Sequence, residues 1–269
     1  QIPADIPKEI GACLTRIARK LESNCPNENS NITQMKNLQT LESTKCILCN
    51  DTGWIFNNSK NSYTQCDCNK SQIIIEQLAA TGIGPNAIKK SFKDFETWNP
   101  QVKKMKDTST SYYLSFHRIK DQGNNSLALL GDSGVGKTHL LVALINNFVS
   151  KQSVKVVYMS YIDAITELKQ NVLNGEVYQR IIRKYKNAEI LAVDDLFKNG
   201  YTESDLRIMS EIVNYRYINN LPMMFSSEYL LKDLIDIDKA IGGRIKEMSQ
   251  NYLCEISGVE NNYRMKGGN

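Results

Sequence analysis

The sequence lacks an apolar segment long enough to cross a bilayer, which takes about 18 or more consecutive, predominantly apolar residues. We therefore exclude a protein embedded in a membrane. The segment that begins at Gln1 also lacks the basic and then apolar pattern of a secretory signal. A strong excess of one charge is missing too, because 33 basic and 29 acidic side chains give a net charge of +4. This balance permits contact with nucleic acid but does not demand it.

The seven cysteines lack the even spread of a secreted disulfide framework, since four of them lie between positions 46 and 68. Such clustering indicates metal ligation in a reducing compartment, so we expect a cytoplasmic location. The sequence has no internal repeat at solenoid spacing. Hydrophobic residues make up 41% and charged residues 23% of the 269 residues, which is ordinary globular usage and argues against wholesale disorder.

Four segments differ in composition. The first contains Ile6, Ile10, Leu14, Ile17 and Leu21 at helical spacing, followed by a polar linker rich in Asn and Ser. The second holds the clustered cysteines. We predict an amphipathic helix and linker over 1–40, a zinc-binding module over 41–80, a connector over 81–125 and a larger domain over 126–269.

Strand and helix patterns alternate along the last segment. Strands are predicted at 126–130, 154–160, 189–194, 222–227 and 252–256. Helices are predicted at 107–121, 137–150, 161–187 with a break near 174–175, 203–219 and, in pieces, 230–248. Such alternation is typical of a parallel sheet covered by helices on both faces. The predicted fold class is α/β, with a small helical and zinc-binding region at the N-terminal side.

A phosphate-binding loop matches the pattern G-x-x-x-x-G-K-[ST] between an apolar strand and a helix. Its residues are Gly131, Asp132, Ser133, Gly134, Val135, Gly136, Lys137 and Thr138, and His139 opens the helix. The backbone N–H groups and the helix N-terminus favour phosphate oxygens. We expect Lys137 to reach the β- and γ-phosphates and the Thr138 hydroxyl to bind Mg²⁺. The sequence therefore predicts a site for a nucleotide with Mg²⁺.

Two carboxylates end the apolar strand over 189–194. Asp194, at the strand tip, is predicted to hold the Mg²⁺, and Asp195 to polarise the attacking water. Phosphoryl transfer depends mostly on positioning and charge stabilisation, so a second carboxylate beside the metal ligand indicates a hydrolase more than a passive binder.

The clustered cysteines have spacing suited to zinc. The four predicted ligands are Cys46, Cys49, Cys66 and Cys68. A closed shell of four thiolates leaves no position for a catalytic water, so the predicted role is structural. The aromatic residues between them could stack on nucleobases or could pack the small module itself; these are Trp54, Phe56 and Tyr63.

The last 150 or so residues resemble an AAA+ ATPase, and within it the replicative-helicase loaders of the DnaC/DnaI type, with the IstB transposition helpers as relatives. The motifs that carry the resemblance lie at 131–138, 191–196, 212–217, 221–228, 241–245 and 262–264. The order of a zinc module before the ATPase is similar to that of the Gram-positive type of loader.

The resemblance implies further site residues. A sensor of the γ-phosphate is expected at Ser227 or Glu228, although an ionised Glu cannot donate a hydrogen bond where many relatives have Asn. Arg244 matches the arginine finger that reaches into a neighbouring subunit, with a solvated surface arginine as the alternative. Arg264 matches the second sensor, with the same alternative. Few residues follow Gly258, so we expect the C-terminal lid to be reduced or missing.

The function implied by the resemblance is an ATP-dependent loader that places the replicative helicase hexamer on single-stranded DNA. Its implied partners are the helicase, single-stranded DNA and further copies of the chain in a ring or spiral, and no membrane. Three alternatives stay open: an ATPase helper of a transposase, a non-hydrolysing nucleotide-dependent adaptor, and a small-molecule kinase, for which no phosphoacceptor pocket is recognisable.

Overall fold

The computed structural model describes residues 46, 48–49, 52–57, 61–66, 76, 78–84 and 90–265. The chain divides into two compact units, residues 1–52 and 53–269, with the boundary inside the cysteine segment. In the first unit the described residues form a turn, in which the backbone N–H and the hydroxyl of Thr52 both donate to the Cys49 carbonyl. The helix predicted over 6–21 and the linker after it lie outside the described residues.

The second unit begins with a hairpin. Strand β1 (Trp54–Asn57) pairs antiparallel with β2 (Ser62–Gln65), so that Phe56 lies opposite Tyr63 with their rings 5.0 Å apart. The Cys66 N–H donates to the Gly53 carbonyl at 2.8 Å and closes the hairpin at its open end. Glu76 and residues 78–80, which precede the sheet domain, are helical.

Five parallel strands form the central sheet in the order β4-β5-β6-β3-β7. They are β3 (Leu127–Gly131), β4 (Val156–Ser160), β5 (Ile190–Asp194), β6 (Met223–Ser227) and β7 (Leu253–Ile256). Every residue of β3, β5 and β6 is buried, as expected for strands whose two faces are both covered. All five predicted strands are confirmed within two residues.

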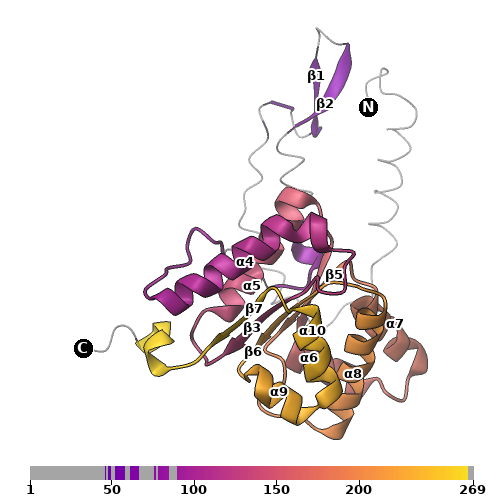
Figure 1. Ribbon diagram of the computed structural model, residues 1–269. Coiled ribbons are helices and arrows are strands. Elements are labelled where there is room, and N and C mark those ends of the chain that lie inside the picture. The colour runs from indigo at the N-terminus through magenta and orange to yellow at the C-terminus, as the bar shows by residue number, and fades with distance from the viewer. Residues whose placement is uncertain are drawn as a thin grey trace, which may run out of the picture. The chain divides into compact units, whose positions relative to one another are not determined.

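Helices cover the two faces of the sheet (Figure 1). They are α4 (Pro100–Ile119), α5 (Lys137–Gln152), α6 (Tyr161–Gln170), α7 (Gly175–Lys186), α8 (Glu203–Ile218), α9 (Leu231–Ile237) and α10 (Lys239–Met248). Alternate strand residues point to opposite faces. Thus Leu127 and Leu129 pack with α4 and α5 in one apolar cluster, whereas Ala128 and Leu130 pack with α6 to α10 in a second. The predicted α/β fold class is confirmed.

Helix α4 begins earlier than the sequence pattern indicated. The predicted helix began at residue 107, but the helix begins at Pro100, after Asn99, whose side chain accepts from the Val102 N–H at 2.9 Å. Val102 and Met105 are buried and extend the apolar stripe of the helix. The exposed lysines at 103 and 104 lie between these two buried positions, and they make this part of the sequence look like a polar connector.

The other helix boundaries follow the predicted breaks. The long helical segment ends at Gln170 and resumes at Gly175, where the Asn174 side chain accepts from the Val177 N–H. After β7 the described residues form two 3-10 turns, η2 (Val259–Asn261) and η3 (Tyr263–Met265), and no α-helix. Within the described part of the chain, no helix has both the length and the apolar character needed to cross a membrane.

Candidate nucleotide-binding site

The phosphate loop connects the end of β3 to the start of α5. Gly134 and Gly136 have positive φ angles of 80° and 95°, which L side chains rarely adopt. A Cβ at Gly134 would lie 2.1 Å from Asn262 Oδ1, and one at Gly136 would lie 2.5 Å from the Phe95 ring. Glycine is therefore required both by the backbone conformation and by the two segments that pack onto the loop.

The Lys137 side chain lies along the loop. Its ammonium donates to the carbonyls of Gly131 at 2.6 Å and Asp132 at 2.8 Å, and the residue is 5% exposed. Burial lowers the pKa of Lys137, while the negative charges of Glu228 and Asp195 raise it. The net effect is a lowered pKa, and a titratable group perturbed in this way at the edge of a cleft is a candidate functional residue.

Asp194 ends β5 and accepts hydrogen bonds from three hydroxyl groups. Thr138 Oγ1 donates to its Oδ1 at 3.0 Å, Tyr158 donates to its Oδ2 at 2.8 Å, and the Ser226 hydroxyl also donates to Oδ1. Burial and the charge of Asp194 raise the pKa of Tyr158, which keeps the phenol a donor. Thr138 and Asp194, the two predicted Mg²⁺ ligands, are thus in direct contact, and hard oxygen donors fit that ion.

Asp195 follows the strand in a left-handed conformation with a φ of 57°. Its N–H donates to Ser226 Oγ at 2.8 Å, and its carboxylate accepts from Lys198 at 2.6 Å. Lys198 lies 3.9 Å from Glu228 Oε1. A lysine thus lies between the two carboxylates that follow β5 and β6.

A cavity of about 540 Å³ opens at this edge of the sheet. Its walls include the phosphate loop, the carboxylates after β5 and β6, the segment before α4 and the turn η3. Of the predicted site residues, those that line it are Ser133, Gly134, Gly136, Lys137, Thr138, His139, Asp195, Glu228 and Arg264.

Six predicted residues do not line the cavity: Gly131 and Asp194, which end β3 and β5, and four others. Val135 is buried in the apolar core, and Asp132 accepts from the Gly258 N–H at 2.7 Å. Ser227 donates to the Leu196 carbonyl at 2.8 Å and accepts from the Tyr229 N–H, so both hydrogen bonds of its hydroxyl are to backbone groups. Arg244, on α10, lies over the Tyr217 ring at 5.6 Å and does not line the cavity.

Several cavity residues escaped the sequence analysis. Phe95 packs edge-on against His139 with ring centroids 5.3 Å apart, and Trp98 lies 5.3 Å from the Tyr263 ring. Lys198 was missed as well. The recurrence of aromatic residues at 92, 95 and 98 in an otherwise polar segment was the available signal. Such apolar rings beside polar groups are typical of ligand pockets.

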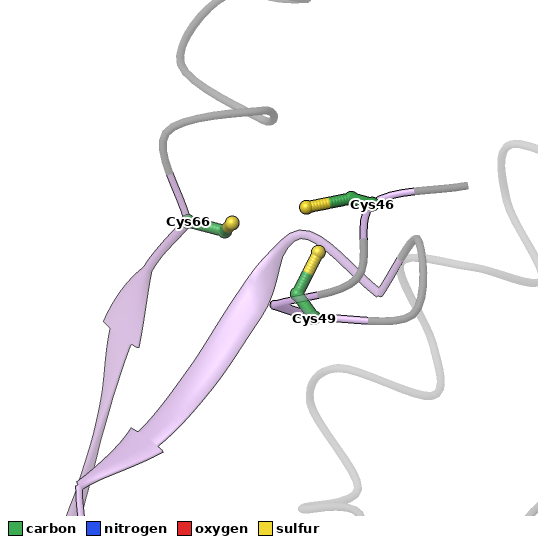
Figure 2. Close-up of side chains that lie close together, drawn as sticks. All are labelled: Cys46, Cys49 and Cys66. Atoms are coloured by element: carbon green, nitrogen blue, oxygen red, sulfur yellow. The ribbon is translucent and has the colours of Figure 1, made fainter. Parts of the chain in front are cut away.

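Three of the four predicted zinc ligands are described, and Cys68 lies outside the described residues. The Sγ atoms of Cys46, Cys49 and Cys66 lie within 4.8 Å of one another, and Figure 2 shows them pointing toward a common centre. Zinc–sulfur bonds of about 2.3 Å in a tetrahedral site place the ligands about 3.8 Å apart. The donor set therefore fits a zinc ion.

Comparison with known proteins identifies the family. Residues 86–232 match the family described as IstB-like ATP binding protein. The chain belongs to this family. It is 35% identical over 233 residues to the phage-like element PBSX protein XkdC of Bacillus subtilis, covering 82% of this chain and 86% of that protein. It is 37% identical over 216 residues to the uncharacterised protein YqaM of the same species, covering 77% and 68%.

The fold of this IstB-like chain is similar to that of a solved helicase loader. The crystal structure of the DnaC helicase loader superimposes with a TM-score of 0.57 at 22% identity, covering 64% of this chain and 99% of that one. At this identity the similarity establishes the fold. The chain therefore belongs to an ATP-binding family and has the fold of the DnaC helicase loader, as its sequence motifs predicted.

Proposed function

We propose that this protein hydrolyses ATP with Mg²⁺. The observation that carries the proposal is the contact between Thr138 and Asp194, beside an Asp195 that faces the cavity. In this proposal Thr138 and Asp194 hold the ion, Lys137 holds the phosphates, and Asp195 accepts a hydrogen bond from the attacking water. Such positioning supplies most of the catalysis in phosphoryl transfer.

We further propose that ATP drives the loading of the replicative helicase hexamer onto single-stranded DNA. Support comes from the fold shared with the DnaC helicase loader and from the cysteine cluster, which precedes the ATPase domain as in the Gram-positive loaders that the sequence resembles. The segment over 1–40 is proposed to grip the helicase. The division into this segment, a zinc module, a connector and an ATPase domain, and a cytoplasmic location, belong to the same proposal.

Self-association into a ring or spiral is part of the mechanism that we propose. Arg244 does not line the cavity of its own chain. We therefore assign Arg244 to the site of a neighbouring copy, where a permanently charged guanidinium suits stabilisation of the transition state. Arg264, which does line the cavity, is proposed to contact the nucleotide of its own chain.

The cysteine cluster is proposed to bind one structural zinc ion, with Cys68 as the fourth ligand. Four thiolates would close the coordination shell and leave no open position for catalysis. This zinc would hold together a segment whose described hairpin has four-residue strands and exposed aromatic rings.

A second client is favoured by the family match itself. The IstB proteins that the sequence resembles are ATPase helpers of transposases, and residues 86–232 match that family.

A non-hydrolysing adaptor is the third candidate, because Glu228 at the end of β6 is an acceptor where a donor to phosphate is expected. Phosphate release at saturating single-stranded DNA separates this adaptor from both ATPases.

Native mass spectrometry of the chain mixed with the replicative helicase of its own source tests the client. With ATP we expect several copies per helicase hexamer, a different stoichiometry with ADP, and the mass of one zinc ion per chain. Lys137→Ala is the control that should remove the nucleotide dependence and retain the zinc. An absence of any complex with either nucleotide would contradict the loader proposal, and a chain mass without metal would contradict the zinc site.

A further inference from the structure

The turn that follows β5 has an unusual backbone. Three of its non-glycine residues, Asp195, Phe197 and Asn199, have φ angles of 57°, 61° and 64°. Left-handed conformations are uncommon for non-glycine residues, least so for Asn and Asp, and they persist where the surroundings hold them. Here Phe197 is fully buried beside Tyr161, with ring centroids 5.5 Å apart. The turn is therefore held in one conformation by the core.

This conformation presents Lys198 to the cavity. Leu196 and Phe197, the two residues before it, are both 0% exposed and anchor the turn. The Leu196 N–H also donates to the Ser226 carbonyl at 2.8 Å, which ties the turn to β6. Lys198 lines the same cavity as Lys137 and Thr138, and its side chain is 36% exposed.

Lys198 is the cation between two carboxylates. Its ammonium lies 2.6 Å from Asp195 Oδ2 and 3.9 Å from Glu228 Oε1. The hydrogen bond to Asp195 raises the pKa of Lys198, so the side chain stays charged. Because Lys137 also experiences the charges of Asp195 and Glu228, all four groups share one electrostatic environment at the edge of the sheet.

The strand end that would carry a γ-phosphate sensor offers no suitable donor. The Ser227 hydroxyl donates to the Leu196 carbonyl, and an ionised Glu228 has no proton to donate. A terminal phosphate brought beside Asp195 and Glu228 would meet two negative charges, and only a nearby cation offsets that repulsion. Lys198 is placed to supply it.

We propose that Lys198 is the γ-phosphate sensor of this site, a role that it takes over from the end of β6. The terminal phosphate carries more negative charge than one carboxylate, so it draws the ammonium away from Asp195. Asp195 is then free to accept a hydrogen bond from the attacking water, while Glu228 keeps Lys198 at the cavity. ADP lacks the γ-phosphate and leaves the Lys198–Asp195 pair intact. This inference rests on the ATPase function proposed above.

The test compares ATP and ADP affinity in Lys198→Met, using fluorescent analogues of both nucleotides with Mg²⁺. A hydrogen bond to a charged group contributes about 1.5–3 kcal/mol, so ATP affinity should fall about tenfold or more while ADP affinity stays unchanged. Lys198→Arg keeps the charge and should retain the preference for ATP. Lys151→Met, which removes an exposed lysine at the end of α5, is the matched control. Equal changes in ATP and ADP affinity would overturn the proposal.

A second measurement uses the unaltered protein and so does not depend on the folding of a variant. Acetylation of individual lysines is followed by mass spectrometry with a non-hydrolysable ATP analogue or with ADP. We expect the ATP analogue to protect Lys198 more than ADP does, with Lys151 unaffected by either. Equal protection by the two nucleotides would overturn the assignment. If the protein binds both nucleotides but releases no phosphate, hydrolysis is disproved and the affinity ratio still tests Lys198.

Discussion

The two ends of the central sheet treat buried charge in opposite ways. At the amino ends of β5 and β6, the guanidinium of Arg216 is 0% exposed and donates to the carbonyls of Tyr185, Lys186, Ala188 and Pro222 at 2.7–3.0 Å. At the carboxyl ends, Lys137, Lys198 and the carboxylates around them border a cavity. One end encloses its charge in backbone, and the other leaves its charges facing a space that a ligand can enter.

This difference between the two ends distinguishes a charged side chain that stabilises the fold from one that can bind a ligand. Burial lowers the pKa of Arg216 to about 9, so its guanidinium stays charged at neutral pH, and four carbonyls compensate for the water that it has lost. The two carbonyls that Lys137 contacts belong to the phosphate loop itself. Phosphate oxygens can therefore compete for the Lys137 ammonium, whereas nothing can reach Arg216.

The largest effect is expected from Lys137→Ala at the cavity end. Charge-assisted hydrogen bonds to phosphate contribute about 1.5–3 kcal/mol each, so ATP affinity should fall at least about a hundredfold and hydrolysis should be lost. Fluorescent-nucleotide titration and phosphate release measure the two effects. Lys151→Ala, in the same helix, is the control and should change neither. Unchanged turnover in Lys137→Ala would refute the assignment of the phosphate loop.

Arg244→Ala adds a third kind of charged residue to the comparison, because Arg244 lies on helix α10 and at neither end of the sheet. If Arg244 acts on the transition state in a neighbouring copy, hydrolysis should fall by about a thousandfold or more while ATP binding stays nearly intact. Arg207→Ala removes an exposed arginine on α8 and is the control. Steady-state phosphate release and nucleotide titration are measured on the same samples. An equal loss of binding and turnover would exclude a role as a finger in trans.

Arg216→Met is expected to change nucleotide binding and hydrolysis least and the free energy of unfolding most. Four carbonyls would lose a donor in a region closed to water, so the free energy of unfolding should fall by at least about 3 kcal/mol. Urea denaturation measures this loss, and Lys137→Ala should lose less. The folded fraction should bind ATP as before. Arg216→Lys, which keeps the charge with fewer donors, should lie in between. A loss below about 1 kcal/mol would mean that the carbonyls find other partners.

Local patterns predicted most of the architecture. The five strands are apolar runs bounded by polar residues, and each was found within two residues of its predicted position. The start of α4 was missed, because its buried positions alternate with lysines, and only the sheet beneath them shows which residues face inward. The cap at Asn99 followed by Pro100 was a signal that sequence analysis could have used.

Some site residues could likewise be predicted from the sequence, and others could not. The phosphate loop and the Asp194–Asp195 pair can be recognised in the sequence, because the residues that perform the chemistry follow one another closely along the chain. Lys198 does not, since its role depends on a turn with three left-handed non-glycine residues and on Glu228, 30 residues later in the chain. Ser227 was a plausible sensor by position, but its hydroxyl bonds to the backbone of the preceding turn.

By itself the sequence determined the α/β class, the phosphate loop and its acidic partners, because these follow from short-range periodicity and from residues close together in the chain. Only the tertiary structure decided which charges face the cavity and which are enclosed. Trp98 meets Tyr263, and Lys198 meets Glu228, across separations that no local pattern encodes. The physical reason is that parallel strands bring their carboxyl ends to one edge, and that packing between distant segments, rather than residue type, sets how much water each charge keeps.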